Sequence, residues 1–199
     1  MEAKMFEATG KGNTRAAEYA NAQDFCRIFD KDMNSLYLLA LLLTGDHEKA
    51  QQSFVAGLEN AKNRSTVFKE WARSWARRVI VQNALRAVNP RPGGENAAPR
   101  AASPRNDGDE RPQIAAVLEM EPFDRFVFVL SVLEDYSDHE CAILLNSTRR
   151  DVLAARIRAY EHMGRAAKFR DVERLDSRAA AQAEFDRAPY SASCMQVAG

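Results

Sequence analysis

Four arginines lie close together in the last third of the chain, directly after a threonine and an aspartate spaced for helix capping. They are Arg149, Arg150, Arg156 and Arg158. Thr148 and Asp151 have the spacing at which two side chains close the first turn of a helix reciprocally, so the arginines would occupy that helix. Arginine reads guanine edges and binds phosphates. A solvated charged face is the alternative, and we favour contact with DNA because of the elements described below.

A second basic cluster alternates with two tryptophans. It comprises Lys69, Arg73, Arg77 and Arg78. Tryptophans among basic residues could form a stacking platform for single-stranded DNA. However, Trp71 and Trp75 are four residues apart and in line with Phe68 and Val79, which is typical of the buried stripe of an amphipathic helix. We therefore predict tryptophans in the core and basic residues on the exposed face.

No constellation of residues indicates catalysis. The chain has three scattered histidines, no glycine-rich phosphate loop and no Gly-x-Ser-x-Gly motif. His139, Glu140 and Cys141 are consecutive, so on a helix they point in different directions and make a poor metal site. We expect Cys141 to be a small buried residue, and we expect no enzyme activity, cofactor, metal or small-molecule substrate.

The composition is that of a soluble globular protein. The 199 residues include 28 basic and 28 acidic side chains, so any nucleic-acid contact must come from local clustering of charge. Three widely spaced cysteines fit a reducing compartment. The N-terminus lacks the apolar core of a signal peptide, and the apolar run Leu36–Leu43 is far shorter than the ~20 residues that span a bilayer. We expect a cytoplasmic protein without membrane contact.

Helical periodicity dominates the first half of the chain. Apolar residues from Asp24 to Leu43 predict one helix, which Thr44–Gly45 would end because glycine tolerates the left-handed conformation. Asp46 can cap a second helix that reaches Ala61, and a third begins near Ser65–Thr66. Residues 89–112 then hold five of the seven prolines and three glycines, which predicts a flexible linker.

The second half of the chain has the pattern of a helix-turn-helix. Pro122 suits the first turn of a helix that runs to Leu133. A capping box at Ser137 and Glu140 opens a short helix, Asn146–Ser147 makes a turn, and the arginine-bearing helix is expected to run to about Met163–Gly164. Residues 165–187 resemble a marginal further helix, and we expect the last dozen residues to be disordered.

The predicted fold is all-α, with two small helical domains joined by a flexible linker. The expected boundaries are a flexible arm at 1–23, a three-helix domain at 24–88, the linker at 89–112, the helix-turn-helix domain at 113–164 and a partly disordered extension at 165–199.

This order resembles the extracytoplasmic-function group of the sigma-70 family of bacterial sigma factors. The resemblance to region 2 of that family is carried by Leu43–Asp46, Ala50, Phe68, Trp71, Ala76 and Arg77. The resemblance to region 4 is carried by Tyr136, Ser137, Glu140, Cys141, Ala142 and Leu145. The recognition helix of the family is similar to 153–157 if the turn carries one extra residue, a register that gives an apolar row at Leu153, Ile157 and Tyr160.

The resemblance implies a protein of transcription initiation or its regulation, in which region 4 reads duplex promoter DNA. The implied DNA-binding residues are Thr148, Arg149, Arg150, Arg156 and Arg158. The implied contacts with the −10 element or a single strand are Lys69, Arg73, Arg77 and Arg78. The implied contacts with RNA polymerase core are Asp46, Gln51, Gln52 and Val55. An anti-sigma factor is a further implied partner.

Several polymerase-contact positions depart from the family pattern. Gln51, Gln52 and Val55 stand where family members carry an acidic pair and a glutamine. We therefore expect weaker binding to the polymerase clamp, because charge-assisted contacts are stronger than neutral ones. The alternative function is a sigma look-alike that acts as a protein-interaction module, binding an anti-sigma factor or another partner without core polymerase activity.

Overall fold

The computed structural model describes residues 18–63, 67–93 and 112–187, and every regular element in these ranges is helical. The first group of elements is α2 (Ala22–Lys31), α3 (Met33–Thr44), α4 (His47–Lys62), the 3-10 turn η1 (Lys69–Trp71) and α5 (Ala72–Val88). The second group is α6 (Pro112–Leu118), α7 (Pro122–Phe128), the π-helical turn η2 (Val129–Leu133), α8 (Asp138–Leu144) and α9 (Arg149–Arg187). The all-α prediction is confirmed for the described ranges. Most of the predicted N-terminal arm, most of the predicted linker and the last dozen residues lie outside them.

The first predicted helix is two helices, so the prediction of one continuous helix from Asp24 was wrong. Asn21 and Asp24 form a capping box at the start of α2. The helical path changes at Asp32, whose φ and ψ are −102° and 17°. Aspartate is a weak helix former, and the Asp32 carboxylate is bound by Arg73 Nε at 2.7 Å, so a side-chain contact holds the bend in place.

The end predicted at Thr44–Gly45 is confirmed as the end of α3. Gly45 follows α3 with φ of 66°, the left-handed conformation that glycine adopts without strain. The Asp46 side chain then accepts a hydrogen bond from Lys49 N at 2.9 Å and caps α4. Close packing of α4 on α5 depends on Gly57, because a Cβ atom there would lie 2.6 Å from Ile80 Cδ1.

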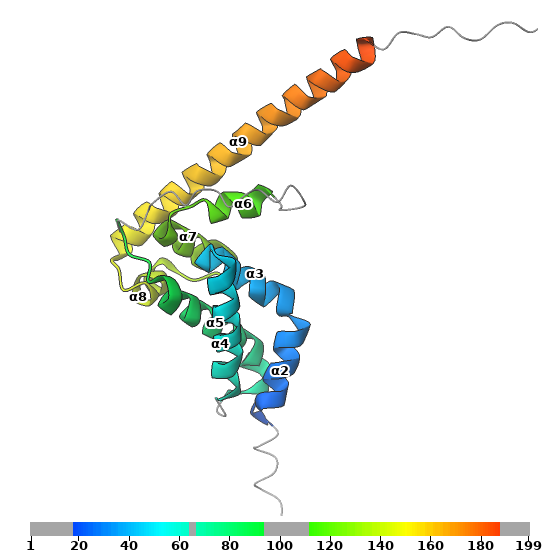
Figure 1. The fold of residues 1–199 in the computed structure, drawn as a ribbon. Coiled ribbons are helices and arrows are strands. Elements are labelled where there is room, and N and C mark those ends of the chain that lie inside the picture. Colours follow the sequence, from blue (N-terminus) through cyan, green and yellow to red (C-terminus); the bar gives the residue numbers. More distant parts are fainter. Residues whose placement is uncertain (1–17, 64–66, 94–111, 188–199) are drawn as a thin grey trace, which may run out of the picture.

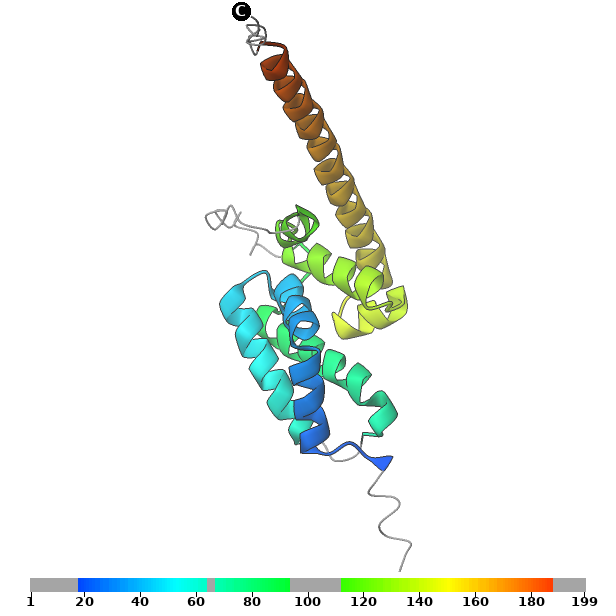
Figure 2. The ribbon, with the colours of Figure 1, turned by 90° about the vertical axis from the view of Figure 1, so that its right-hand side faces the viewer.

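The last helix is longer than its sequence pattern predicts. α9 continues through Gly164 to Arg187, so the predicted end at Met163–Gly164 was wrong and the predicted marginal helix is its continuation. One glycine costs a helix only about 1 kcal/mol relative to alanine, and the segment that follows is rich in Ala and Arg, which favour helix. Figures 1 and 2 show α9 projecting from the rest of the molecule.

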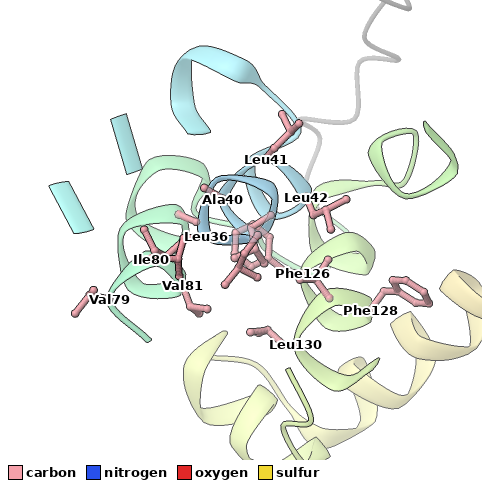
Figure 3. Packing of buried hydrophobic residues seen from close by; sticks show 14 of the residues in the cluster. Leu36, Ala40, Leu41, Leu42, Val79, Ile80, Val81, Phe126, Phe128 and Leu130 are labelled. Carbon is pink, nitrogen blue, oxygen red and sulfur yellow. The ribbon is translucent and has the colours of Figure 1, made fainter. Parts of the chain in front are cut away.

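The two groups of helices share one buried core. α3 is apolar on all sides, which is typical of a helix surrounded by others, and it packs against α4 and α5 on one side and against α7 on another. Figure 3 shows side chains of α3, α5, α7 and η2 converging there, among them Leu36, Ile80, Phe126 and Leu130. The division into two domains joined by a linker stays a prediction.

Among the described helices, none combines the length and the apolar character that a membrane span requires.

Candidate nucleic-acid interface

Two capping motifs frame the turn between α8 and α9, as predicted. Glu140 N donates to Ser137 Oγ at 3.3 Å, and Ser137 N donates to Glu140 Oε2 at 2.8 Å. Asp151 N donates to Thr148 Oγ1 and Thr148 N donates to Asp151 Oδ2, both at 3.2 Å. Between them Asn146 has φ of 46°, a left-handed conformation that asparagine tolerates better than most residues. The turn therefore has a fixed shape that sets the start of α9.

The capping carboxylates are held in their charged form. Hydrogen bonds from the Ser137 side chain and backbone lower the pKa of Glu140. Those from Thr148 lower the pKa of Asp151 in the same way. A carboxylate at a helix N-terminus also interacts favourably with the helix dipole. Both caps are consequently ionised at neutral pH.

The four arginines predicted to bind DNA fall into two pairs. Arg149 and Arg150 are exposed in the first turn of α9, and neither has an ion-pair partner among the described residues. Arg156 Nη1 donates to Asp138 Oδ1 at 2.6 Å. Arg158 donates to both carboxylate oxygens of Asp124, at 2.9 and 2.6 Å, and this contact raises the pKa of Arg158. The second pair fixes α9 to α8 and α7, whereas the first pair remains free for a ligand.

The apolar row of the recognition-helix register lies outside the core. Leu153, Ile157 and Tyr160 are 38%, 59% and 53% exposed. The residues of α9 that are buried are instead Val152, Ala155 and Ala159. The outward face of α9 therefore presents apolar side chains next to its two free arginines.

The basic residues around α5 are mostly engaged within the molecule. Lys69 Nζ lies 4.0 Å from Asp24, and Arg73 is bound to Asp32 as described above. Arg77 donates from Nε to Glu134 Oε2 at 2.8 Å and from Nη2 to Glu134 Oε1. Because Glu134 belongs to the second group of helices and its side chain is only 6% exposed, this ion pair joins the two groups. It also raises the pKa of Arg77.

The two tryptophans behave differently. Trp71 is 60% exposed, so its predicted place in the core was wrong. It lies in the 3-10 turn before α5, out of line with the helical stripe, and its ring meets Phe68 edge-to-face at 5.3 Å. Trp75 is half-buried against the core, as the periodicity predicts.

Both tryptophans line a cavity of about 360 Å³ with Val67, Ser74, Arg78 and Tyr136. Tyr136 comes from the second group of helices, and burial raises its pKa. Arg78, the fourth basic residue of the cluster, is exposed and faces this cavity. The arrangement places a cation and three aromatic side chains around one hollow, which suits a planar ring better than a purely polar group.

The residues predicted to contact polymerase lie along α4. Asp46 is occupied as the N-cap of that helix. Gln51, Gln52 and Val55 are exposed, and Val55 is 48% exposed. Gln52 Nε2 donates to Glu48 Oε1 at 3.3 Å. These three positions are therefore uncharged, although α4 also exposes the charged residues Glu48 and Glu59.

Sequence reasoning missed the charged residues that hold these surfaces in place. Asp124 and Arg125 are 7% and 5% exposed. A signal for this was present, because apolar residues surround them from Phe123 to Leu130 without helical alternation. A helix apolar on all sides is buried, and buried charges are paired. No comparable local signal in the sequence indicates that Glu134 is buried and paired with Arg77.

Within the described ranges, no group of three or more histidine, cysteine or acidic side chains is placed to hold a metal ion. Cys141 is fully buried as predicted, and burial raises the pKa of its thiol to about 11.

Comparison with known protein families, curated proteins and solved structures found no match.

Proposed function

We propose that this chain is a sigma-factor-like DNA-binding protein that acts in transcription initiation or its regulation. In this proposal the α8–α9 unit docks on duplex promoter DNA, and the N-terminal helices engage RNA polymerase or the melted strand. The proposal rests on the sequence resemblance described above and on the geometry of the α8–α9 unit.

The observation that carries the proposal is the start of α9. Its two exposed arginines, Arg149 and Arg150, follow a turn that two capping motifs fix, and they adjoin a helix N-terminus, where the backbone favours anions. A helix-turn-helix presents the N-terminal residues of its second helix to DNA in this way. Arg156 and Arg158 then position α9 through Asp138 and Asp124 instead of reading bases.

A salt titration of the full chain on duplex DNA tests the proposal. Replacing both Arg149 and Arg150 by alanine should weaken binding and lower the slope of log affinity against log salt by about 2, or about 1 for each lost phosphate contact. Arg86→Ala is the matched control, because Arg86 is an exposed arginine near the end of α5. Undetectable binding by the wild type at low salt would rule out the promoter-reading role.

The exposed apolar face of α9 and the uncharged positions Gln51, Gln52 and Val55 of α4 favour a second candidate function. Under this second candidate function, the chain acts as a protein-interaction module that binds an anti-sigma factor or another partner. Gln51, Gln52 and Val55 lack the charges that would pair with a basic surface on polymerase. The variant Gln51→Glu with Gln52→Asp should tighten binding to polymerase core if α4 is the contact. No detectable binding by either protein would favour the interaction module.

A further inference from the structure

The outward face of α9 carries a short apolar row that nothing in the described structure covers. We name Leu153, Ile157 and Tyr160 the α9 stripe. Their spacing of four and three residues places them on one side of the helix, and each is more than a third exposed. Figures 1 and 2 both show the first turns of α9 at the edge of the molecule, where another chain could approach.

The helix that carries the α9 stripe is packed firmly on the rest of the molecule. Tyr160 packs its ring edge-to-face on Phe128 of α7, with ring centroids 6.2 Å apart. The helix beneath is fixed by the buried residues Val152 and Ala155 and by the ion pair of Arg156 with Asp138. An apolar surface held in this way loses little conformational freedom on binding.

Charged residues of opposite sign lie along one edge of the α9 stripe. Arg150 and Glu161 are both exposed, and neither has an ion-pair partner within the described ranges. They are eleven residues apart, which is about three helical turns, so they lie on the same flank of α9. An approaching helix with the reverse order of charges along this flank would satisfy both.

A second copy of α9 in antiparallel orientation has that order. When two identical helices pack antiparallel about a twofold axis, each flank faces its own counterpart running the other way. Arg150 of one copy then faces Glu161 of the other, and Leu153 faces Tyr160. Ile157 meets Ile157 at the centre. For each pairing, the twofold axis would pass midway along the helix between the two paired residues. These three midpoints lie within about 1.5 residues of one another, or roughly 2 Å along the helix, so a single position of the axis allows all three contacts.

We propose that the α9 stripe is a homodimer interface, in which the α9 helices of two copies pack antiparallel about a twofold axis near Ile157. The dimer would cover Arg150, one of the two free arginines at the start of α9. Dimerisation and DNA binding by this face would therefore compete. The dimer itself does not depend on the proposed DNA-binding function.

Sedimentation equilibrium of the full chain over a range of concentrations, without DNA, tests this proposal. We expect the wild type to associate reversibly to a dimer. Ile157→Glu should raise the dimer dissociation constant at least tenfold, because it places two like charges at the centre of the contact. Met33→Glu is the control, since Met33 is an apolar residue of α3 that is 52% exposed, and it should leave the dissociation constant unchanged.

A charge reversal tests the antiparallel register. Arg150→Glu and Glu161→Arg should each raise the dissociation constant several-fold, because each replaces two attractive pairs by two repulsive ones. The double variant should return it to within about threefold of the wild-type value. All four residues changed in these experiments are exposed, and circular dichroism would verify that each variant is folded.

Three results would overturn the proposal. They are a chain that stays monomeric at several hundred micromolar, a dimer that Ile157→Glu leaves intact, and a double charge reversal that fails to restore association. Because no DNA is present, a failure of the proposed promoter-reading role would leave this test unaffected.

Discussion

The guanidinium of Arg125 donates a hydrogen bond to the main-chain oxygen of Thr44 at 3.0 Å. It also donates to Leu43 O at 3.3 Å, so this buried cation binds the C-terminal end of α3, where a positive charge is favoured. On the other side it donates to Met120 O at 3.0 Å and to Leu118 O at 3.3 Å, at the end of α6. One side chain of α7 therefore ties together the ends of two helices from the two groups.

Replacing Arg125 by methionine should destabilise the protein strongly. The variant keeps much of the side-chain length, but it leaves main-chain oxygens without their donor in a buried site. The expected loss in the free energy of unfolding is on the order of 3 kcal/mol. Arg86→Met, at an exposed site, should change it by less than about 0.5 kcal/mol. Urea unfolding measures both, and equal stabilities would contradict the role of Arg125.

Gly45 should be sensitive to substitution for two separable reasons. Its φ is +66°, which strains any residue with a Cβ, and that Cβ would lie 2.6 Å from Arg125 Cζ. Gly93 has the same φ with nothing within 4 Å, so Gly93→Ala measures the backbone cost alone, which we expect to be about 1 kcal/mol. Gly45→Ala should cost clearly more in urea unfolding. Equal losses would show that Arg125 moves aside freely.

The ion pair of Arg77 with Glu134 should limit access to the basic face of α5. Glu134→Gln removes the negative charge and weakens the contact that holds the Arg77 guanidinium, which is partly exposed and also donates to Ser35 Oγ at 3.2 Å. If this face binds a single strand, the affinity should rise, and the salt slope should increase by about 0.7 for one further phosphate contact. Glu119→Gln is a control at an exposed acidic residue. Filter binding or fluorescence anisotropy on single-stranded DNA gives both quantities, and unchanged binding would contradict this function for Arg77.

Local signals in the sequence predicted the ends of elements well where one side chain determines the geometry. Gly45, Asp46 and the two capping motifs around Asn146 lie where their residue types indicate, because capping involves neighbours three residues apart. The bend at Asp32 could not be predicted in this way, since the Arg73 that binds Asp32 comes from a different helix.

The roles of charged residues were harder to predict than the helices. Sequence spacing grouped Arg149, Arg150, Arg156 and Arg158 as equivalent, yet Arg156 and Arg158 have acidic partners on other elements. Those partners, Asp138 and Asp124, are 18 and 34 residues away in the chain. The prediction of a buried Trp71 was wrong for a related reason. α5 begins at Ala72, one residue after Trp71, so the Trp71 ring does not fall on the buried stripe of that helix.

The capping box of α8 should make stability depend on pH in the acidic range. The pKa of Glu140 in the folded chain is lowered from 4.5 by its hydrogen bonds with Ser137. A lowered folded-state pKa means that the carboxylate stabilises the fold above pH 4.5, and that this contribution is lost as the pH falls through the lower, folded-state pKa. Glu140→Gln should therefore be less stable than the wild type at pH 7, and the difference should shrink below pH 4.5. Thermal unfolding across this range tests it, and a difference independent of pH would show that the charge is unimportant.

Cys141 should report on opening of the α8–α9 unit through its thiol. The side chain is fully buried, and burial raises its pKa to about 11, so only about one thiol in a thousand is ionised at pH 8. In a variant with Cys26→Ser and Cys194→Ser, we expect Cys141 to react with a disulfide reagent only after local or global unfolding. The companion variant that keeps the exposed Cys26 alone should react promptly under the same conditions. Adding urea should accelerate labelling of Cys141 in parallel with unfolding. Rapid labelling of Cys141 in native buffer would instead show that α8 separates from α9 and η2 far more often than this packing implies.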